Sequence, residues 1–225
     1  MVMKKEPRAK KRVFVVDDHP IVRHGLAQLI NQQTDLEVCG EAEDAVQALE
    51  NIMSAKPDIA IVDLTLKTTS GLDLIKNLKT QSPNVPILVL SMHDESVYAE
   101  RALRAGARGY IMKEKLTDNV VLAIRRILDG KLYLSDEMRE KMLYILADVP
   151  SDKAPSPLER LSDRELQVFE LIGGGFETSE IAEKLHMSRK TVHSYRTRIK
   201  EKFHLKKSSE LQKLAFHWTH SGNMK

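Results

Sequence analysis

Short apolar runs and helically spaced segments alternate through the first half of the chain. Five apolar runs predict buried strands, at residues 13–16, 36–39, 59–62, 87–90 and 110–112. Apolar residues at helical spacing follow each run, in segments 21–30, 45–53, 72–78, 97–103 and 116–128. Strands that alternate with helices need crossover connections. The pattern therefore predicts an α/β, flavodoxin-like, doubly wound parallel sheet with helices on both faces.

The remainder of the chain carries helical patterns only. Residues 135–146 predict one more helix, and prolines at 150, 155 and 157 mark a linker, because proline lacks an amide donor and holds its neighbours extended. We place the domain boundary between about Ala147 and Glu159. The expected parts are a basic, disordered leader (1–11), the α/β domain (12–130), a helix with a Pro-containing linker (131–157) and a smaller all-α domain (158–225).

Helix-start signals recur in the C-terminal part. Ser162 and Glu165 have the spacing of a capping box, so a helix is expected to begin there and to stop at the glycines 173–175. Thr178 can cap a second, short helix, and a third begins at Ser188. Two short helices joined by a tight turn, the second of them basic, predict a helix-turn-helix.

The third of these helices has two distinct faces. Its apolar stripe, expected to be buried, consists of Val192, Tyr195, Ile199 and Phe203. The other face offers donors for phosphates and base edges, from Arg189, Lys190, His193, Ser194, Thr197 and Arg198. Any one of these side chains could simply be solvated. Their clustering favours a DNA-binding face.

Charge is segregated along the chain, although the net charge is only +3. Residues 13–150 hold 15 basic and 21 acidic residues, whereas residues 184–207 hold nine basic residues and one acidic residue. The basic stretch is typical of a surface that contacts a phosphate backbone, with a solvated helix face as the alternative. No apolar run approaches the roughly 20 residues of a membrane span, so we expect a cytoplasmic protein without a membrane partner.

Polar side chains follow the predicted strands at their carboxyl ends. Asp17 and Asp18 follow the first strand, Asp63 the third, Ser91 the fourth and Lys113 the fifth. Ligands of open parallel sheets bind at this edge, and three converging carboxylates need a hard cation such as Mg²⁺. A carboxylate beside a metal ion, a lysine and a hydroxyl can accept a phosphoryl group, and Asp63 would be that acceptor. A single aspartate in such a place could merely cap a helix, but the full set argues against that.

The first domain resembles the receiver domain of two-component response regulators in four motifs: VFVVDDHP, IAIVDLTLKTTSGLDL, ILVLSMHDE and GARGYIMKE. The resemblance implies that Asp63 accepts phosphate from a sensor histidine kinase. It also implies Mg²⁺ ligands at Asp17, Asp18, Asp63 and the backbone carbonyl of Thr65, a switch hydroxyl at Ser91, a phosphoryl contact at Lys113 and a mobile aromatic at Tyr110. Where the family often has proline, this chain has Lys67 and Glu114, which bears on loop geometry rather than on phosphoryl acceptance.

The second domain resembles the LuxR-type output domain, and the two domains together resemble the NarL/FixJ class. The resemblance implies base-reading positions at His193, Ser194 and Thr197, with backbone contacts from Lys190, Thr191 and Arg198. Thr178 and Arg189 are also expected to contact DNA. The last helix of this class pairs two output domains on DNA. Here it would use Leu211, Leu214 and Trp218, a stripe that would fit a domain core equally well.

These patterns predict a phosphorylation-controlled transcriptional regulator. Its expected partners are a histidine kinase, double-stranded promoter DNA, a second copy of the chain upon activation, and RNA polymerase. Two rival functions stay open. A phosphatase that uses Asp63 would need a second carboxylate near the nucleophile, which the sequence Asp63-Leu64-Thr65 lacks. A constitutive DNA-binding protein would use its first domain only for dimerisation.

Overall fold

The computed structural model describes residues 9–66, 70–147 and 157–221, and it divides into two compact units. The first unit extends to Leu143 and the second begins at Tyr144. The basic leader up to residue 8, Lys67 and the linker residues 148–156 lie outside the described ranges.

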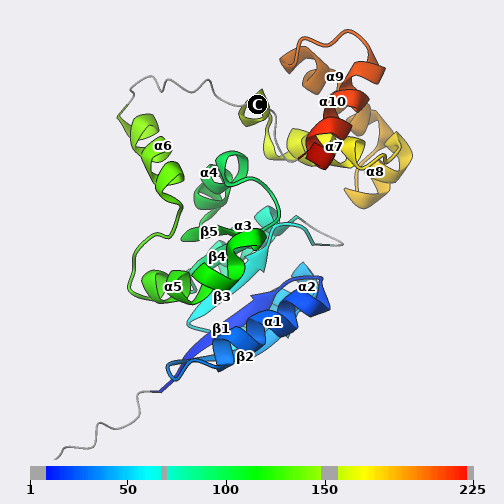
Figure 1. Cartoon of the computed structure of the whole chain (residues 1–225). Coiled ribbons are helices and arrows are strands. Elements are labelled where there is room, and N and C mark those ends of the chain that lie inside the picture. The colour runs from blue at the N-terminus through cyan, green and yellow to red at the C-terminus, as the bar shows by residue number, and fades with distance from the viewer. Residues whose placement is uncertain (1–8, 67–69, 148–156, 222–225) are drawn as a thin grey trace, which may run out of the picture. The chain divides into compact units, whose positions relative to one another are not determined.

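The first unit is built on a five-stranded parallel sheet (Figure 1). Its spatial order is β2-β1-β3-β4-β5, as the doubly wound prediction requires. All residues of β3 and β4 are buried, because these short apolar runs are covered on both faces. The strands are β1 (Lys11–Val16), β2 (Leu36–Ala42), β3 (Ile59–Asp63), β4 (Ile87–Ser91) and β5 (Gly109–Met112).

Helices cover both faces of this sheet. On one face α1 (Pro20–Asn31) and α5 (Leu116–Leu128) share an apolar core with the strands, while α2 (Ala45–Ala55), α3 (Gly71–Gln81) and α4 (Glu95–Ala105) form the other layer. Local signals fix their ends. The Asp44 side chain caps α2 by accepting from the Gln47 amide, and α4 ends at Gly106, whose φ of 119° suits glycine.

The chain after α5 continues to pack on the first unit. The Tyr133 amide donates to the Arg108 carbonyl and the Tyr133 carbonyl accepts from the Tyr110 amide, so this residue bridges to β5 at Gly109. Helix α6 (Asp136–Leu146) then begins, with Met138 buried against the unit. Residues 131–138, which the sequence assigned to the helix and linker, therefore lie against the sheet domain.

The described residues of the second unit form helices only. A 3₁₀ turn, η2 (Pro157–Arg160), precedes α7 (Asp163–Gly173), α8 (Thr178–Lys184), α9 (Arg189–Lys202) and α10 (Ser208–Ser221). The predicted capping box is present: the Ser162 amide donates to Glu165 Oε2 at 2.7 Å, and the Glu165 amide donates to Ser162 Oγ at 3.3 Å. The prediction that Thr178 caps α8 was wrong. Glu177 is the N-cap, and its amide donates to the Glu180 side chain.

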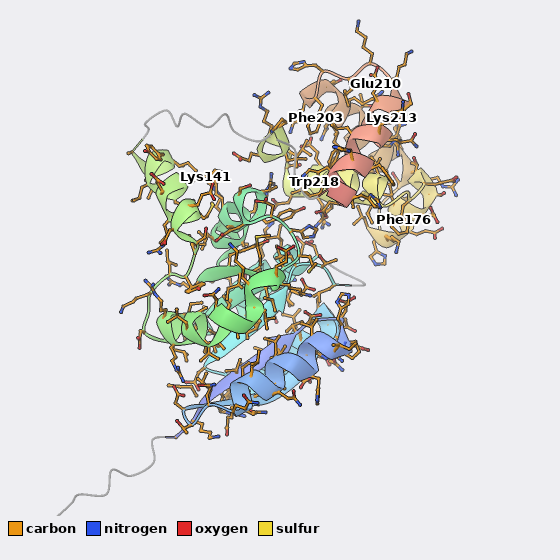
Figure 2. All side chains as sticks on the ribbon, in the orientation of Figure 1. Lys141, Phe176, Phe203, Glu210, Lys213 and Trp218 are labelled. Atoms are coloured by element: carbon orange, nitrogen blue, oxygen red, sulfur yellow. The ribbon has the colours of Figure 1, made fainter. Side chains whose placement is uncertain are left out.

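Aromatic packing joins three of these helices. The Phe169 ring of α7 stacks on Phe203 with 5.4 Å between centroids and lies 5.9 Å from the Trp218 ring of α10. Phe203 and Trp218 are both labelled in Figure 2. This cluster holds α9 and α10 against α7, which leaves the opposite side of α9 for a ligand.

Candidate functional site

Three carboxylates meet at the carboxyl edge of the sheet. Asp17 and Asp63 are each 1% exposed and Asp18 is 9% exposed. The Lys113 ammonium reaches them from the end of β5, with Nζ 2.7 Å from Asp17 Oδ2 and 2.7 Å from Asp63 Oδ2. The structure thus brings together four of the five residues that follow the predicted strands, and the fifth, Ser91, is buried at the end of β4.

The charges of this pocket are incompletely balanced. Burial raises the pKa of Asp63 to about 6, although the Lys113 ammonium and the Thr65 amide act in the opposite direction. Burial disfavours the Lys113 ammonium, but its bonds to Asp17 and Asp63 outweigh this and raise its pKa. Three carboxylates face one ammonium, so a divalent cation would complete the balance, and oxygen donors fit Mg²⁺.

Asp18 and Thr65 have the placement that such a cation needs. Asp18 Oδ1 is buried and lies 2.8 Å from the His19 ring Nδ1, and ligand atoms of Asp17, Asp18 and Asp63 lie within 4.8 Å of one another. Buried carboxylates this close together repel one another unless a cation neutralises them. Thr65 lies directly beyond β3, with its amide 3.1 Å from Asp63 Oδ1. The geometry therefore fits the expected magnesium ligands.

Ser91 and Tyr110 are connected through one loop residue. Ser91 Oγ accepts a bond from the His93 amide at 3.1 Å, and the Tyr110 hydroxyl donates to the His93 carbonyl at 2.8 Å. Both Ser91 and Tyr110 are buried, and burial raises the pKa of Tyr110. Any movement of the loop after β4 must therefore also change the hydrogen bond that holds the Tyr110 ring.

Two histidines at this edge escaped the sequence prediction. His93 Nε2 lies 3.0 Å from Thr65 Oγ1, and its ring stacks on Tyr98 of α4 at 4.5 Å. Burial and the Lys113 charge lower the pKa of His93 to about 4, so the ring is neutral near pH 7. His19 lies beside Asp17 and Asp18. The available signal was adjacency: each histidine is within two residues of a predicted site residue.

Of the two residues that stand where the family often has proline, the structure describes only Glu114. Glu114 lies in the exposed 3₁₀ turn η1 (Lys113–Lys115), directly after the site lysine. Lys67 lies outside the described residues. Lys113 contacts both Asp17 and Asp63 although the next residue is Glu114 and not proline.

One side of α9 is exposed and polar. Ser188 caps the helix by accepting from the Thr191 amide at 3.1 Å, which places Arg189 at its first turn. Val192 and Ile199 are buried, whereas the predicted stripe residues Tyr195 and Phe203 are only partly buried. The exposed predicted contacts are Arg189, Lys190, Thr191, His193, Ser194 and Arg198, with Thr178 and Thr197 partly exposed.

Two hydroxyls of this face bond to their own helix. Ser194 Oγ donates to the Lys190 carbonyl and Thr197 Oγ1 to the His193 carbonyl, each at 3.1 Å. Their oxygen atoms can still accept a hydrogen bond, and the cations beside them can donate. This face can therefore bind a polyanion and present a histidine to base edges.

The α10 stripe packs inside its own unit. Leu211 and Trp218 are buried and Leu214 is partly buried, because α10 packs on α7. Leu211 and Trp218 are therefore core residues, and the alternative of a core stripe holds for them. The exposed side of α10 presents Phe216, whose ring stacks on His220 at 4.0 Å.

Comparison with known proteins decides the family. Residues 13–125 match the response regulator receiver domain, and residues 159–215 match the bacterial regulatory proteins of the luxR family. The oxygen regulatory protein NreC of Staphylococcus carnosus is 35% identical over 208 residues, which cover 91% of this chain and 96% of that protein. The chain is a response regulator of the LuxR family.

Solved structures share the regulator's fold. A LuxR-family two-component response regulator from Aurantimonas sp. SI85-9A1 is 33% identical, with a TM-score of 0.57 over 62% of this chain and 99% of that chain. RcsB from Salmonella enterica serovar Typhimurium, bound to promoter rprA with the phosphomimetic BeF3-, is 26% identical. Its TM-score is 0.71, over 92% of this chain and 98% of that chain.

The family assignment settles the broad function. The regulator combines a receiver domain with a LuxR-type DNA-binding domain, as two-component transcription regulators do. Its relatives are regulators and not metabolic enzymes, so the phosphatase alternative has no support. Within the described ranges, no helix has both the length and the apolarity needed to cross a membrane.

Proposed function

We propose that a phosphoryl group transferred to Asp63 controls how this regulator binds DNA. The observation that carries the proposal is the pocket around this carboxylate. Asp63 is buried, its Oδ2 lies 2.7 Å from Lys113 Nζ, and Asp17 and Asp18 lie beside it. A buried acid with a raised pKa, a fixed cation and two further carboxylates is an arrangement suited to phosphoryl transfer.

The chemistry follows from these groups. A carboxylate oxygen of Asp63 attacks the phosphorus of a phosphohistidine on the sensor kinase, so a P–O bond forms as the P–N bond breaks and the histidine nitrogen leaves. Lys113 stabilises negative charge on the transferring oxygens. Mg²⁺ held by Asp17, Asp18, Asp63 and the Thr65 carbonyl would supply further positive charge when bound.

The acyl phosphate would act through the loop after β4. New phosphoryl oxygens are acceptors for the Ser91 hydroxyl and the Lys113 ammonium. In the unphosphorylated structure the His93 amide donates to Ser91 Oγ, and the Tyr110 hydroxyl donates to the His93 carbonyl. When Ser91 turns to bind the phosphoryl group, His93 therefore shifts, and the Tyr110 hydroxyl shifts with it. The Tyr110 side chain thereby carries the change to the surface at β5.

The output step is binding of double-stranded promoter DNA by α9. Lys190, Thr191 and Arg198 would contact phosphates, and His193, Ser194 and Thr197 would face base edges. Thr178 and Arg189 would contact the backbone at the helix starts. The RcsB structure bound to a promoter supports this role by its overall likeness.

We further propose that phosphorylation favours a homodimer on paired half-sites, with α10 as the pairing helix. Leu211 and Trp218 would support α10 from inside, while Leu214 and the exposed Phe216 are available to a second copy. Histidine kinase and RNA polymerase are the remaining partners. Because such a regulator works on chromosomal DNA, we place it in the cytoplasm.

The proposed division of the chain keeps the leader at 1–11 and the DNA-binding domain at 158–225. The receiver extends from residue 12 at least to 130. The bridge from Tyr133 to β5 and the burial of Met138 favour counting residues 131–138 with the receiver. The linker then lies between α6 and η2.

Incubation of the full chain with acetyl phosphate, with and without Mg²⁺, tests the proposal. We expect an Mg²⁺-dependent, hydroxylamine-labile phosphoryl adduct at Asp63, detected by mass spectrometry, together with a shift from monomer to dimer and tighter DNA binding. Asp63→Asn should abolish all three changes. Asp129→Asn, at the exposed C-terminus of α5, is the matched control.

Absence of any adduct in the wild type would refute phosphoryl acceptance. Full regulated DNA binding by Asp63→Asn would instead favour a receiver that serves only for dimerisation. On the DNA side, Lys190→Ala should weaken binding to all sequences and lower the salt slope by about 0.9. His193→Ala should change the base preference.

A further inference from the structure

Helix α6 is anchored on the first turn of α4, and Figure 1 shows the two helices side by side. Glu95 Oε1 accepts a hydrogen bond at 2.9 Å from the amide of Ser135, the residue directly before α6. Lys141 Nζ donates to the Ser96 carbonyl at 2.9 Å, and Lys141 is labelled in Figure 2. Met138 lies between these two bonds in the sequence and is buried. Two consecutive residues of α4 therefore hold the first half of α6.

These two anchors directly follow the loop that joins β4 to α4. His93 of this loop is bonded to both Ser91 and Tyr110, and only Asp94 separates it from Glu95. Asp94 is the N-cap of α4, and its side chain accepts from the amide two residues further on at 2.7 Å. The loop and the first helical turn are therefore one hydrogen-bonded segment. A shift of His93 is passed through this segment to both anchors of α6.

The second half of α6 has little packing to hold it. Leu143 and Leu146 are 66% and 79% exposed, and the residues between them are exposed as well. The helix has 11 residues, and isolated helices shorter than roughly 12–15 residues are marginal in water. Segments with few buried contacts open most easily. The docked position of α6 therefore depends on the two anchors and on Met138.

We propose that the first turn of α4 is a latch that holds α6 on the unphosphorylated receiver, and that phosphorylation of Asp63 opens it. The latch consists of Glu95 and Ser96 with their partners Ser135 and Lys141. Because α6 leads the chain from the receiver towards the DNA-binding domain, its release lengthens the tether between the two domains. A longer tether lets two DNA-binding domains reach paired half-sites. The inference rests on the proposed function, because it names the element that phosphorylation of Asp63 releases.

Hydrogen–deuterium exchange of the full chain in Mg²⁺, with and without the phosphoryl mimic beryllium fluoride, tests the latch. We expect the amides of α6 to exchange at least about fivefold faster when the mimic is bound, the lower end of typical coupling between two sites. The amides of α2, which contributes no residue to the latch, should keep their rates. Unchanged or slower exchange of α6 with the mimic bound would overturn the proposal.

Variants of the latch separate coupling from a merely structural contact. Lys141→Met removes the donor to Ser96, so its α6 amides should exchange fast even without the mimic. Because coupling between two sites is reciprocal, this variant should also bind beryllium fluoride at least about fivefold more tightly. Glu95→Ala removes the other anchor and should act in the same direction.

Glu140→Ala, at an exposed position of α6, is the matched control and should keep the wild-type exchange and affinity. Fast α6 exchange in Lys141→Met without tighter binding of the mimic would show that the anchor only stabilises the helix. That result would overturn the coupling.

Fluorine NMR of bound beryllium fluoride, recorded on the same samples, keeps the two proposals apart. A bound signal together with unchanged α6 exchange refutes only the latch. Absence of a bound signal, together with no labelling of Asp63 by acetyl phosphate, refutes the proposed function itself, and the latch then has no phosphoryl trigger.

Discussion

The two units place their charged groups in opposite environments. The receiver buries Asp17, Asp63 and most of Lys113 at the end of a sheet that is itself buried on both faces. The DNA-binding unit spreads its cations along the exposed side of α9, whose buried side is apolar at Val192 and Ile199. The functional charges of the receiver are therefore buried, and those of the DNA-binding unit are exposed to solvent.

This difference predicts how the stability of each unit responds to a substitution. Removing one member of a buried, coupled set of charges lowers the folding stability strongly, because its partners stay desolvated and unpaired. An exposed face consists of nearly independent contacts, each of modest value. The chain's single tryptophan, Trp218, lies in the second unit, so its fluorescence separates the two responses.

The largest effect is expected for Lys113→Met. This substitution leaves Asp17 and Asp63 buried without their shared cation, at a cost of about 3–5 kcal/mol to the receiver. Urea unfolding followed by circular dichroism should show a destabilised receiver that Mg²⁺ partly restores, while the Trp218 transition stays in place. Exposed Lys131→Met is the control. A matching shift of the Trp218 transition would contradict independent units.

Gly71→Ala should have the next largest effect. A Cβ at this first residue of α3 would clash with the Asp63 carbonyl oxygen and the Leu64 Cα, which are backbone atoms and cannot move without displacing the chain. We expect a loss of about 1–3 kcal/mol, with slower phosphorylation because Asp63 is displaced. Gly25→Ala in α1 is the matched control, since its Cβ would meet no atom within 4 Å. It should raise stability slightly, and equal losses in both variants would exclude the steric explanation.

Lys202→Met probes a charged pair that the second unit partly buries. Lys202 Nζ lies 2.6 Å from Glu165 Oε2, and the lysine side chain is 36% exposed, so after discounting for solvent we expect a loss of about 1–2 kcal/mol. Burial alone would raise the pKa of Glu165, but hydrogen bonds from Lys202 and Ser162 outweigh burial and lower it.

The lowered pKa of Glu165 sets the sign of a pH effect. Its stabilising contribution is present above the usual value of 4.5 and is lost as pH falls through the lower pKa of the folded state. Trp218 fluorescence should therefore show acid destabilisation of the second unit, reduced in Lys202→Met. Lys206→Met, at an exposed position, should keep the wild-type profile.

Removal of a helix cap should give the smallest loss of stability, and the loss should be similar in the two units. Asp44→Ala removes the cap of α2 in the receiver, and Ser162→Ala removes the cap of α7 in the second unit. Each should cost about 1 kcal/mol, because each deletes one side-chain acceptor at an accessible helix start. Thermal unfolding of the two variants checks this. A much larger loss for either would show that its cap is coupled to the core.

The sequence predicted those parts of the site that depend on strand ends. Asp17, Asp63 and Lys113 converge because parallel strands place their carboxyl ends at one edge. The role of His93 could not be predicted, because its contacts with Thr65 and Tyr110 depend on the path of a loop. Periodicity placed Trp218 on a stripe, but only packing against Phe169 shows that this stripe faces inward.

The bridge between Tyr133 and β5 has a consequence for handling the isolated receiver. An unpaired outer strand attracts strands of other molecules, and here the continuing chain occupies that border at Gly109. A fragment cut at residue 130 would uncover the backbone groups of β5 and invite intermolecular pairing. A fragment that runs through Met138 keeps its own cover, and should remain monodisperse at concentrations where the shorter one aggregates.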